Sequence, residues 1–251
     1  MKFRVQFLAV CLAIACASCA APGKHQEQKA VLENYNSYPA VALAQRLKEA
    51  GQSASQEGSL LKVGQREIRI EPQIEREVQK EGRWLIGVGI RVNLDGNDLP
   101  ALRSGAVGID ASREAALKTA AEEWSQEFGA PLVHALFPTS TKHNPAVYGA
   151  YRIFPGPPGI RGSDNIKSFD ASLRELPDVL GRFATQTFHQ GKAEWRGLTV
   201  SIAFTPTQEK KSMCQVDGKM SDELSSAVNR LDWPVDGNYL FKRFYLLAPA
   251  K

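Results

Sequence analysis

The feature that most constrains the fold is a long stretch of alternating side chains at residues 67–92. Ile68 and Ile70 alternate with charged residues, and after Glu81 and Gly82 a second apolar run occupies residues 84–92. A period of two is typical of a strand with one buried face, and a glycine between two such runs favours a turn. The stretch therefore predicts a long antiparallel hairpin with an apolar face that other elements must cover.

Helical and strand periods follow one another along the rest of the chain. They predict helices at residues 37–50, 110–128, 170–183 and 221–231, and strands at residues 106–109, 147–154, 198–204, 213–216 and 239–247. The strongest helix places Leu117, Trp124 and Phe128 on one face, and Asp110 is a residue type that caps helices. No repeat of fixed length is present. The sequence therefore predicts an α+β fold in which helices pack on a mixed, mainly antiparallel sheet.

The N-terminus has the organisation of a secretory signal peptide. Lys2 and Arg4 precede an apolar run at residues 7–15, which is shorter than the ~20 residues needed to span a bilayer as a helix. Small and polar residues follow, as expected of a tether. We expect a signal peptide at residues 1–15, a polar tether at residues 16–36 and a single α+β domain at residues 37–251.

The end of the apolar run resembles the bacterial lipobox, in which a small residue precedes a cysteine that receives a diacylglyceryl group. Ala15 precedes Cys16 in this way, and Cys19 is the alternative acylation site. More than one acyl chain, such as palmitate, anchors a protein stably. Cleavage by the ordinary signal peptidase after Ala15 or Ala17 would instead yield a secreted or periplasmic soluble protein. The preferred prediction is a lipid anchor that holds the domain at a membrane of the bacterial cell envelope.

The charge of the processed chain argues against nucleic acid as a partner. The whole chain has 31 basic and 27 acidic residues, and removal of residues 1–15 takes Lys2 and Arg4 with it. The near-neutral remainder has no basic run flanked by aromatic residues. The expected partners are the membrane, through the lipid anchor, and a protein or another component of the envelope.

Cys214 is the one cysteine of the predicted α+β domain. A thiol nucleophile needs a neighbouring imidazole that lowers its pKa, and His134, His143 and His189 are the candidates. Residues 212–216 have the pattern of a strand, which favours Cys214 as a packed apolar side chain. An envelope thiol enzyme or hydrolase built on Cys214 and a histidine is the alternative.

The other motifs favour structural roles over catalytic or ligand-binding roles. The four histidines are scattered along the sequence, and we expect no metal site and no cofactor. Asp95 to Asp98 favours a turn, because the alternating ligands and closing glutamate of a calcium loop are missing. Glu122 and Glu123 point about 100° apart on their helix, which favours a solvated surface over a catalytic pair. The aromatic residues at 239–245 favour core packing over a ligand groove. No catalytic residue is assigned.

The C-terminal part resembles an uncharacterised bacterial family, a domain of unknown function. The resemblance rests on residues 214–217, the helix after them, residues 231–234 and residues 239–247. It covers the end of the chain clearly and the stretch from residue 106 onward more loosely. The family implies no activity and no catalytic residues.

The sequence favours a non-enzymatic accessory domain that binds a protein or an envelope component at a membrane surface. The leader indicates where the protein is located, whereas the mature chain carries no catalytic motif. An immunity-type inhibitor of a secreted toxin is a further alternative, since small α+β domains can fill that role.

Overall fold

The structure, a computed structural model, describes residues 35–138, 145–162, 166–188, 192–205, 208–235 and 238–250. The described residues all belong to one compact unit, called here the large unit. The predicted signal peptide and the two acylation candidates, Cys16 and Cys19, lie outside the described residues.

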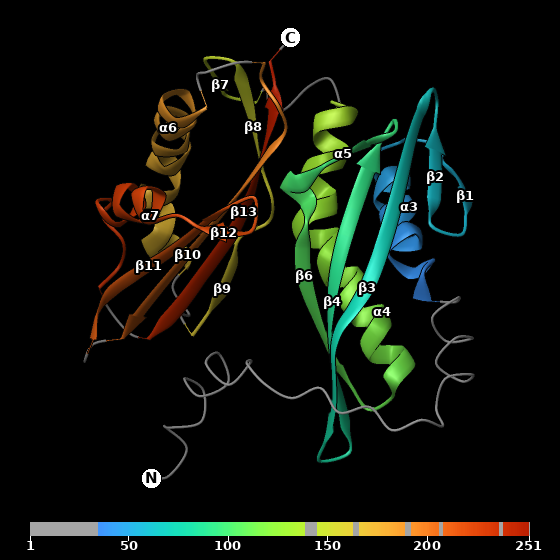
Figure 1. The fold of residues 1–251 in the computed structure, drawn as a ribbon. Coiled ribbons are helices and arrows are strands. Elements are labelled where there is room, and N and C mark those ends of the chain that lie inside the picture. Colours follow the sequence, from blue (N-terminus) through green and yellow to red (C-terminus); the bar gives the residue numbers. More distant parts are fainter. Residues whose placement is uncertain are drawn as a thin grey trace. The chain divides into compact units, whose positions relative to one another are not determined.

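The first half of the large unit is built on one sheet, called sheet A (Figure 1). Its strands are β1 (Ser55–Glu57), β2 (Leu60–Val63), β3 (Arg66–Lys80), β4 (Arg83–Leu94), β5 (Asn97–Asp98) and β6 (Ser104–Asp110). They follow the order β1-β2-β3-β4-β5, and β6 also pairs with β4. The helices of this half are α3 (Tyr38–Glu49), α4 (Arg113–Trp124) and α5 (Ala130–Leu136). α4 packs on β4 and β6, and α3 packs on α4.

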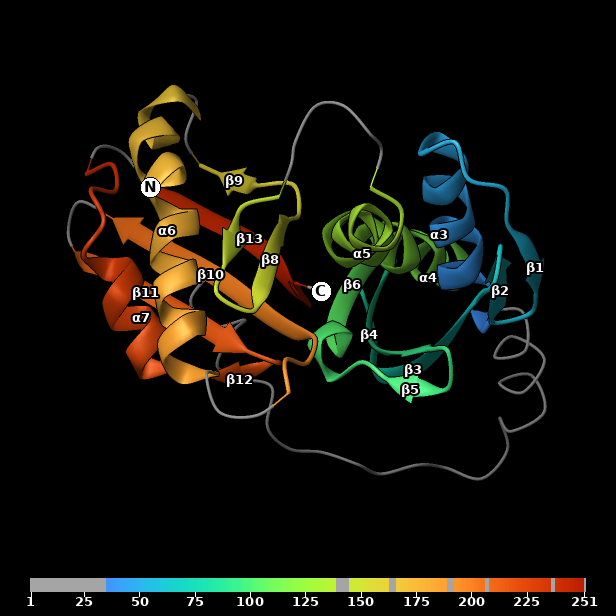
Figure 2. The ribbon, with the colours of Figure 1, turned by 90° about the horizontal axis from the view of Figure 1, so that it is seen from above.

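The second half is built on sheet B, whose two helices lie on one face (Figure 2). Its strands are β7 (Val147–Tyr148), β8 (Tyr151–Pro155), β9 (Gly159–Arg161), β10 (Arg196–Thr205), β11 (Gln208–Val216), β12 (Lys219–Met220) and β13 (Tyr239–Pro249). Their order is β12-β11-β10-β13-β8-β7, with β9 also on β13. α6 (Asp170–Thr187) and α7 (Asp222–Asn229) are the helices. Across both halves, η1 (Pro100–Leu102) and η3 (Ile166–Phe169) are short 3-10 helices, and η2 (Ser125–Gly129) is a π-helical turn that joins α4 to α5.

The predicted α+β class is confirmed, with the strands divided between two sheets. Every strand pair of the described residues is antiparallel. The hairpin predicted from the alternation is β3 and β4. β10 pairs with β11, its neighbour in the sequence, and also with β13, which follows after α7. Sheet B therefore depends on contacts between distant segments.

Apolar alternation explains which face of each sheet is buried. Ile68, Ile70 and Val88 of sheet A are fully buried beneath the helices. In sheet B, the rings of Phe169 and Phe241 are stacked with their centroids 6.0 Å apart, and the indole of Trp233 donates to the carbonyl oxygen of Val228 at 2.9 Å. The predicted core role of the aromatic residues at 239–245 is confirmed, because Tyr239, Phe241, Phe244 and Tyr245 are all buried.

Two local predictions are corrected. Ser112, not Asp110, caps α4, since its hydroxyl accepts the N–H of Ala115 at 3.1 Å. Asp110 ends β6 instead, and its carboxylate accepts the N–H of Ala111. The strand predicted at residues 147–154 is the β7–β8 hairpin, because Gly149 has a positive φ of 56° and turns the chain.

Candidate functional site

The residues singled out by the sequence do not gather into one site. His25, His143 and His189 lie outside the described residues, together with Cys16 and Cys19. Cys214 lies in β11 within the core under α6 and α7, whereas His134 lies exposed on α5, which packs against β8 and β13. The structure gives no hydrogen bond between these two side chains.

The environment of Cys214 is that of a structural thiol in a protein core. Its side chain is fully buried, and its backbone N–H donates to the hydroxyl of Ser225 at 2.9 Å. Burial raises the pKa of the Cys214 thiol to about 11, which keeps the thiol protonated at neutral pH. The prediction of a packed thiol is confirmed for the environment of this residue.

The most promising binding site is a cleft of about 470 Å³ between the two sheets, called here the intersheet cleft. β3, β4 and β6 of sheet A line it on one side, and β10, β11 and β13 of sheet B line the other. Its polar side chains include Gln73, Glu75, Arg91, Arg103, Thr199, Gln215, Asp217 and Lys242. Cavities of this size hold small molecules or single side chains of a partner.

The floor of the intersheet cleft holds the two halves together. The rings of Phe128 and Phe244 meet there with their centroids 4.6 Å apart. Lys242 Nζ lies 2.6 Å from Glu127 Oε1. Gly197 has no side chain to separate β10 from η1, where a Cβ would lie 3.0 Å from the carbonyl carbon of Ala101. These contacts join the two halves of the large unit beside the cleft.

Glu75 is directed into the cleft by a β-bulge. The register between β3 and β4 shifts between Ile74 and Arg76, so that Glu75 has no partner residue across the ladder. Its carboxylate lies over Gly89 of β4, where a Cβ would meet the Glu75 carboxyl carbon at 2.9 Å. Bulges commonly reorient a side chain beside a functional site. The bulge and Gly89 together give the carboxylate its position.

Arg91 is the second charged group without a counterion in the cleft. It lies two residues after Gly89 in β4, on the same face of the strand. Neither Arg91 nor Glu75 has an ion pair within the described part of the chain. The other charges are compensated: Arg103 pairs with Asp98, Lys242 with Glu127, and Asp217 with Arg196. Both side chains are exposed to solvent, and Arg91 lies opposite Glu71 in the register of β3 and β4. They can therefore contact a ligand without breaking an ion pair of the protein.

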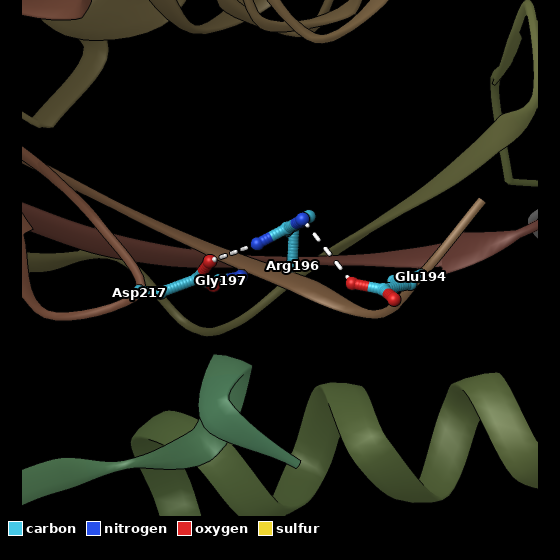
Figure 3. A network of polar contacts seen from close by, with 4 residues as sticks. All are labelled: Glu194, Arg196, Gly197 and Asp217. Atoms are coloured by element: carbon cyan, nitrogen blue, oxygen red, sulfur yellow. Dashed lines mark hydrogen bonds and ion pairs between the residues drawn. The ribbon is translucent and has the colours of Figure 1, made fainter. Parts of the chain in front are cut away.

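Asp217 closes the turn at the edge of the cleft and serves a structural purpose (Figure 3). Its carboxylate accepts hydrogen bonds from the Arg196 guanidinium at 2.9 Å and from the backbone N–H of Gly197 at 2.8 Å. The Glu194 carboxylate lies 3.3 Å from the other amino group of the same guanidinium. The hydrogen bond to Asp217 raises the pKa of Arg196. Asp217 itself has a positive φ of 50° at the β11–β12 turn.

The same arrangement recurs in sheet A. Asp95, with a φ of 51°, precedes a glycine in the β4–β5 turn. Its carboxylate accepts hydrogen bonds from the Arg66 guanidinium at 2.5 Å and from the backbone N–H of Glu67 at 2.9 Å. The turn predicted at residues 95–98 is confirmed. The recurrence indicates that the Asp217 contacts belong to the turn and leave Asp217 unavailable to a ligand.

Glu122 and Glu123 form no catalytic pair. Glu122 faces the groove between α3 and α4. The carboxylate of Glu123 accepts the backbone N–H of Val107 in β6, with Arg161 and Lys242 nearby, and desolvation raises its pKa. A side chain that occupies an edge N–H hinders pairing with another strand. Glu123 therefore protects the edge of sheet A.

No cluster of three or more histidine, cysteine, aspartate or glutamate side chains able to hold a metal is found among the residues that the structure describes. Within the same ranges, no helix is long and apolar enough to cross a membrane.

Sequence reasoning missed Glu75 and Arg91. A signal was present in Gly87 and Gly89, since glycine inside a strand often marks a bulge or a close approach. The signal does not reveal which side chain of the neighbouring strand occupies the space. That choice depends on the register of β3 against β4.

Residues 55–249 match a family described as "Family of unknown function (DUF6348)". The match begins at the first residue of β1 and ends at the last residue of β13. The predicted resemblance to an uncharacterised family is confirmed, and it extends over both sheets. No curated protein and no solved structure matches the chain.

Proposed function

We propose a function for a chain that belongs to this family of unknown function, and the proposal therefore rests on the chain's own residues. The protein is a lipoprotein of the bacterial cell envelope, anchored through Cys16, with Cys19 as the alternative. Its α+β domain is a non-enzymatic binding domain that takes a component of the envelope into the intersheet cleft.

The proposed location at a membrane of the cell envelope is supported by the leader alone. A basic start, a short apolar run and a small residue before Cys16 are the features that lipoprotein processing requires. The match to the family begins at residue 55, after the leader and α3. The anchor would therefore be an addition that carries the family domain to a membrane.

The binding role is supported by the uncompensated charges of the cleft. Glu75 and Arg91 face a cavity of about 470 Å³ and have no ion pair among the described residues. Both side chains are solvent-exposed, and a ligand that pairs with both would form charge-assisted hydrogen bonds. This is the observation that carries the proposal. The buried and protonated Cys214 argues against the thiol-enzyme alternative.

The anchor is tested by intact-mass analysis and membrane fractionation of the chain produced in a bacterial host. We expect the mature protein to begin at Cys16, to carry acyl chains and to sediment with membranes. Cys16→Ser should move it to the soluble fraction, whereas Cys19→Ser should leave it on the membrane. An unmodified N-terminus in the soluble fraction contradicts the anchor, and the reverse behaviour of the two variants assigns it to Cys19.

The binding role is tested by photo-crosslinking in the native host cells. A diazirine amino acid in place of Gln73, an exposed cleft residue, should give a covalent adduct detected as a mass increase of the chain. The same amino acid in place of Gln79, exposed on the same strand but outside the cleft lining, is the control. The adduct at position 73 should disappear in Glu75→Gln/Arg91→Gln. Equal labelling at both positions would exclude the cleft as the binding site.

A further inference from the structure

We infer that sheet A contacts an anionic lipid surface through an apolar patch on the face opposite α4. The patch consists of Val78, Leu85, Val107 and Ile109 and is called here the open-face patch. None of these residues lines the intersheet cleft. The inference adds a direct contact of the domain to the proposed location at a membrane, and its test does not use the lipid anchor.

The strand register places the four side chains next to one another. Val78 is paired with Leu85, and Leu85 is paired with Ile109, so that the three form a row across β3, β4 and β6. Val107 lies two residues before Ile109 in β6 and therefore points to the same side of the sheet. Its partner in β4 is Gly87, which has no side chain to interrupt the patch.

The patch points away from α4 and is open to solvent. Gly108 lies against α4, because a Cβ there would overlap backbone atoms of the helix (Figure 2). Neighbouring residues of a strand point to opposite faces, so that Val107 and Ile109 point away from the helix. The exposed fractions are 36% for Val78, 44% for Val107 and 53% for Ile109. A cluster of exposed apolar side chains indicates an interaction surface.

Basic side chains border the patch on the same face. Arg76 is paired with Gly87 on one side of the Val78 row, and Lys80 is paired with Arg83 on the other side, next to the turn. All three basic side chains are exposed. Within the described ranges, Arg76 and Arg83 form no ion pair, whereas Lys80 Nζ lies 3.6 Å from a carboxylate oxygen at the turn.

The acidic residues of this region are directed elsewhere or paired. Glu77 is paired with the buried Ile86 on the helix face, and its carboxylate contacts Arg113 at 2.6 Å. Asp110 accepts the backbone N–H of the next residue at 2.6 Å. Glu75 lies over Gly89, further along the hairpin than the basic border. The border of the patch is therefore positively charged and complementary to an anionic surface.

The composition of the patch favours a lipid surface over a protein partner. Its apolar side chains are all aliphatic, whereas tryptophan and tyrosine are prominent among the residues that dominate protein interfaces. A second copy of this chain would place arginine against arginine, and like charges oppose association. An anionic bilayer suits both parts of the surface. Aliphatic side chains enter the boundary between headgroups and acyl chains, and basic side chains contact the lipid phosphates.

A fluorescent label within the patch tests the inference. The full chain is used with the cysteines before residue 20 replaced by serine, so that no acylation site is left and Cys214 is buried. Val107→Cys then carries an NBD label. We expect its emission to shift to the blue and to intensify with phosphatidylglycerol vesicles, and to change much less with phosphatidylcholine vesicles. The same label at Ser226→Cys, exposed on α7, should respond to neither. Local emission is the readout because the apolar leader can itself bind vesicles.

Substitutions separate the two parts of the surface. Arg76→Gln/Arg83→Gln should lower the ratio of inserted to water-exposed label about 25-fold, since each basic residue near an anionic surface contributes about a factor of five. Arg182→Gln/Arg230→Gln removes the same charge from exposed positions of α6 and its neighbour after α7, and should have no effect.

The apolar contribution is tested by Val78→Ser/Ile109→Ser. This change should lower the ratio of inserted to water-exposed label at least about tenfold, because two partly exposed aliphatic side chains no longer enter the lipid. Since both positions are exposed, the free energy of unfolding in urea should stay close to that of the parent chain, which checks that the variant is folded.

A label that stays in water with every vesicle, or equal insertion into anionic and neutral vesicles, would overturn the inference. A blue shift that appears without lipid as the protein concentration rises would assign the patch to a second copy instead. A blue shift with polyglutamate but not with vesicles would assign it to an acidic protein. The lipid anchor is judged separately by intact mass and fractionation, because the labelled chain lacks the acylation sites.

Discussion

Cys214 will react with thiol reagents several orders of magnitude more slowly in the folded protein than in the unfolded chain. The side chain is fully buried, and its pKa of about 11 leaves roughly a thousandth of the thiol ionised at pH 8, against roughly a tenth at the ordinary value of 9.0. Since the thiolate is the reactive form, and the reagent must also reach the core, labelling should follow the rate of unfolding. The measurement is the rate of reaction with a chromogenic disulfide reagent.

The labelling experiment uses a chain in which Cys11, Cys16 and Cys19 are replaced by serine, so that Cys214 is the remaining thiol. Adding Ser226→Cys on the exposed surface of α7 gives a positive control that should react within seconds to minutes. Denaturant should abolish the protection of Cys214. Rapid reaction of Cys214 in the folded protein would revive the thiol-enzyme alternative.

Gly108→Ala will destabilise the protein by about 3 kcal/mol or more. α4 lies directly on β6 at this residue, and a Cβ would overlap the carbonyl oxygen of Ala116 and lie 2.8 Å from the backbone nitrogen of Ala120. Backbone atoms of a helix cannot move aside as the end of a flexible side chain can. The helix would have to separate from sheet A, and apolar contacts of Leu117 and Trp124 would be lost. Urea unfolding measures the change in the free energy of unfolding.

Gly105→Ala is the matched control for this prediction, because it lies on the opposite face of the same strand, where a Cβ would make only an ordinary contact at 3.8 Å. It should change the free energy of unfolding by no more than about 1 kcal/mol. If Gly108→Ala were as stable as Gly105→Ala, the close packing of α4 on β6 would be wrong.

The periodicity of the sequence predicted the elements better than their partners. β3 and β4 are adjacent in the sequence, so that alternation and one turn were enough to predict their pairing. β10 joins β13 across α7, and no local signal indicates a pairing between segments so far apart. The division into two sheets followed from such distant pairs and was not predicted.

The candidate site was not predictable for a related reason. No sequence pattern distinguishes Glu75 from the other charged residues of the same predicted strand. It becomes distinctive only because a shift of register places it over Gly89, and because sheet B closes the other side of the cavity. The burial of Cys214 could be predicted more easily, because the strand pattern around it favoured a side chain that points into the core.

By itself the sequence determined the α+β class, the positions of the main helices and strands, and the expectation of a lipid anchor at Cys16. These depend on local properties: apolar periodicity, turn residues and a short apolar leader. Only the tertiary structure decided that two sheets form, that Cys214 is fully buried, and that Glu75 and Arg91 face one cleft. These depend on contacts between residues far apart in the chain, which arise from packing and leave no periodic signal in the sequence.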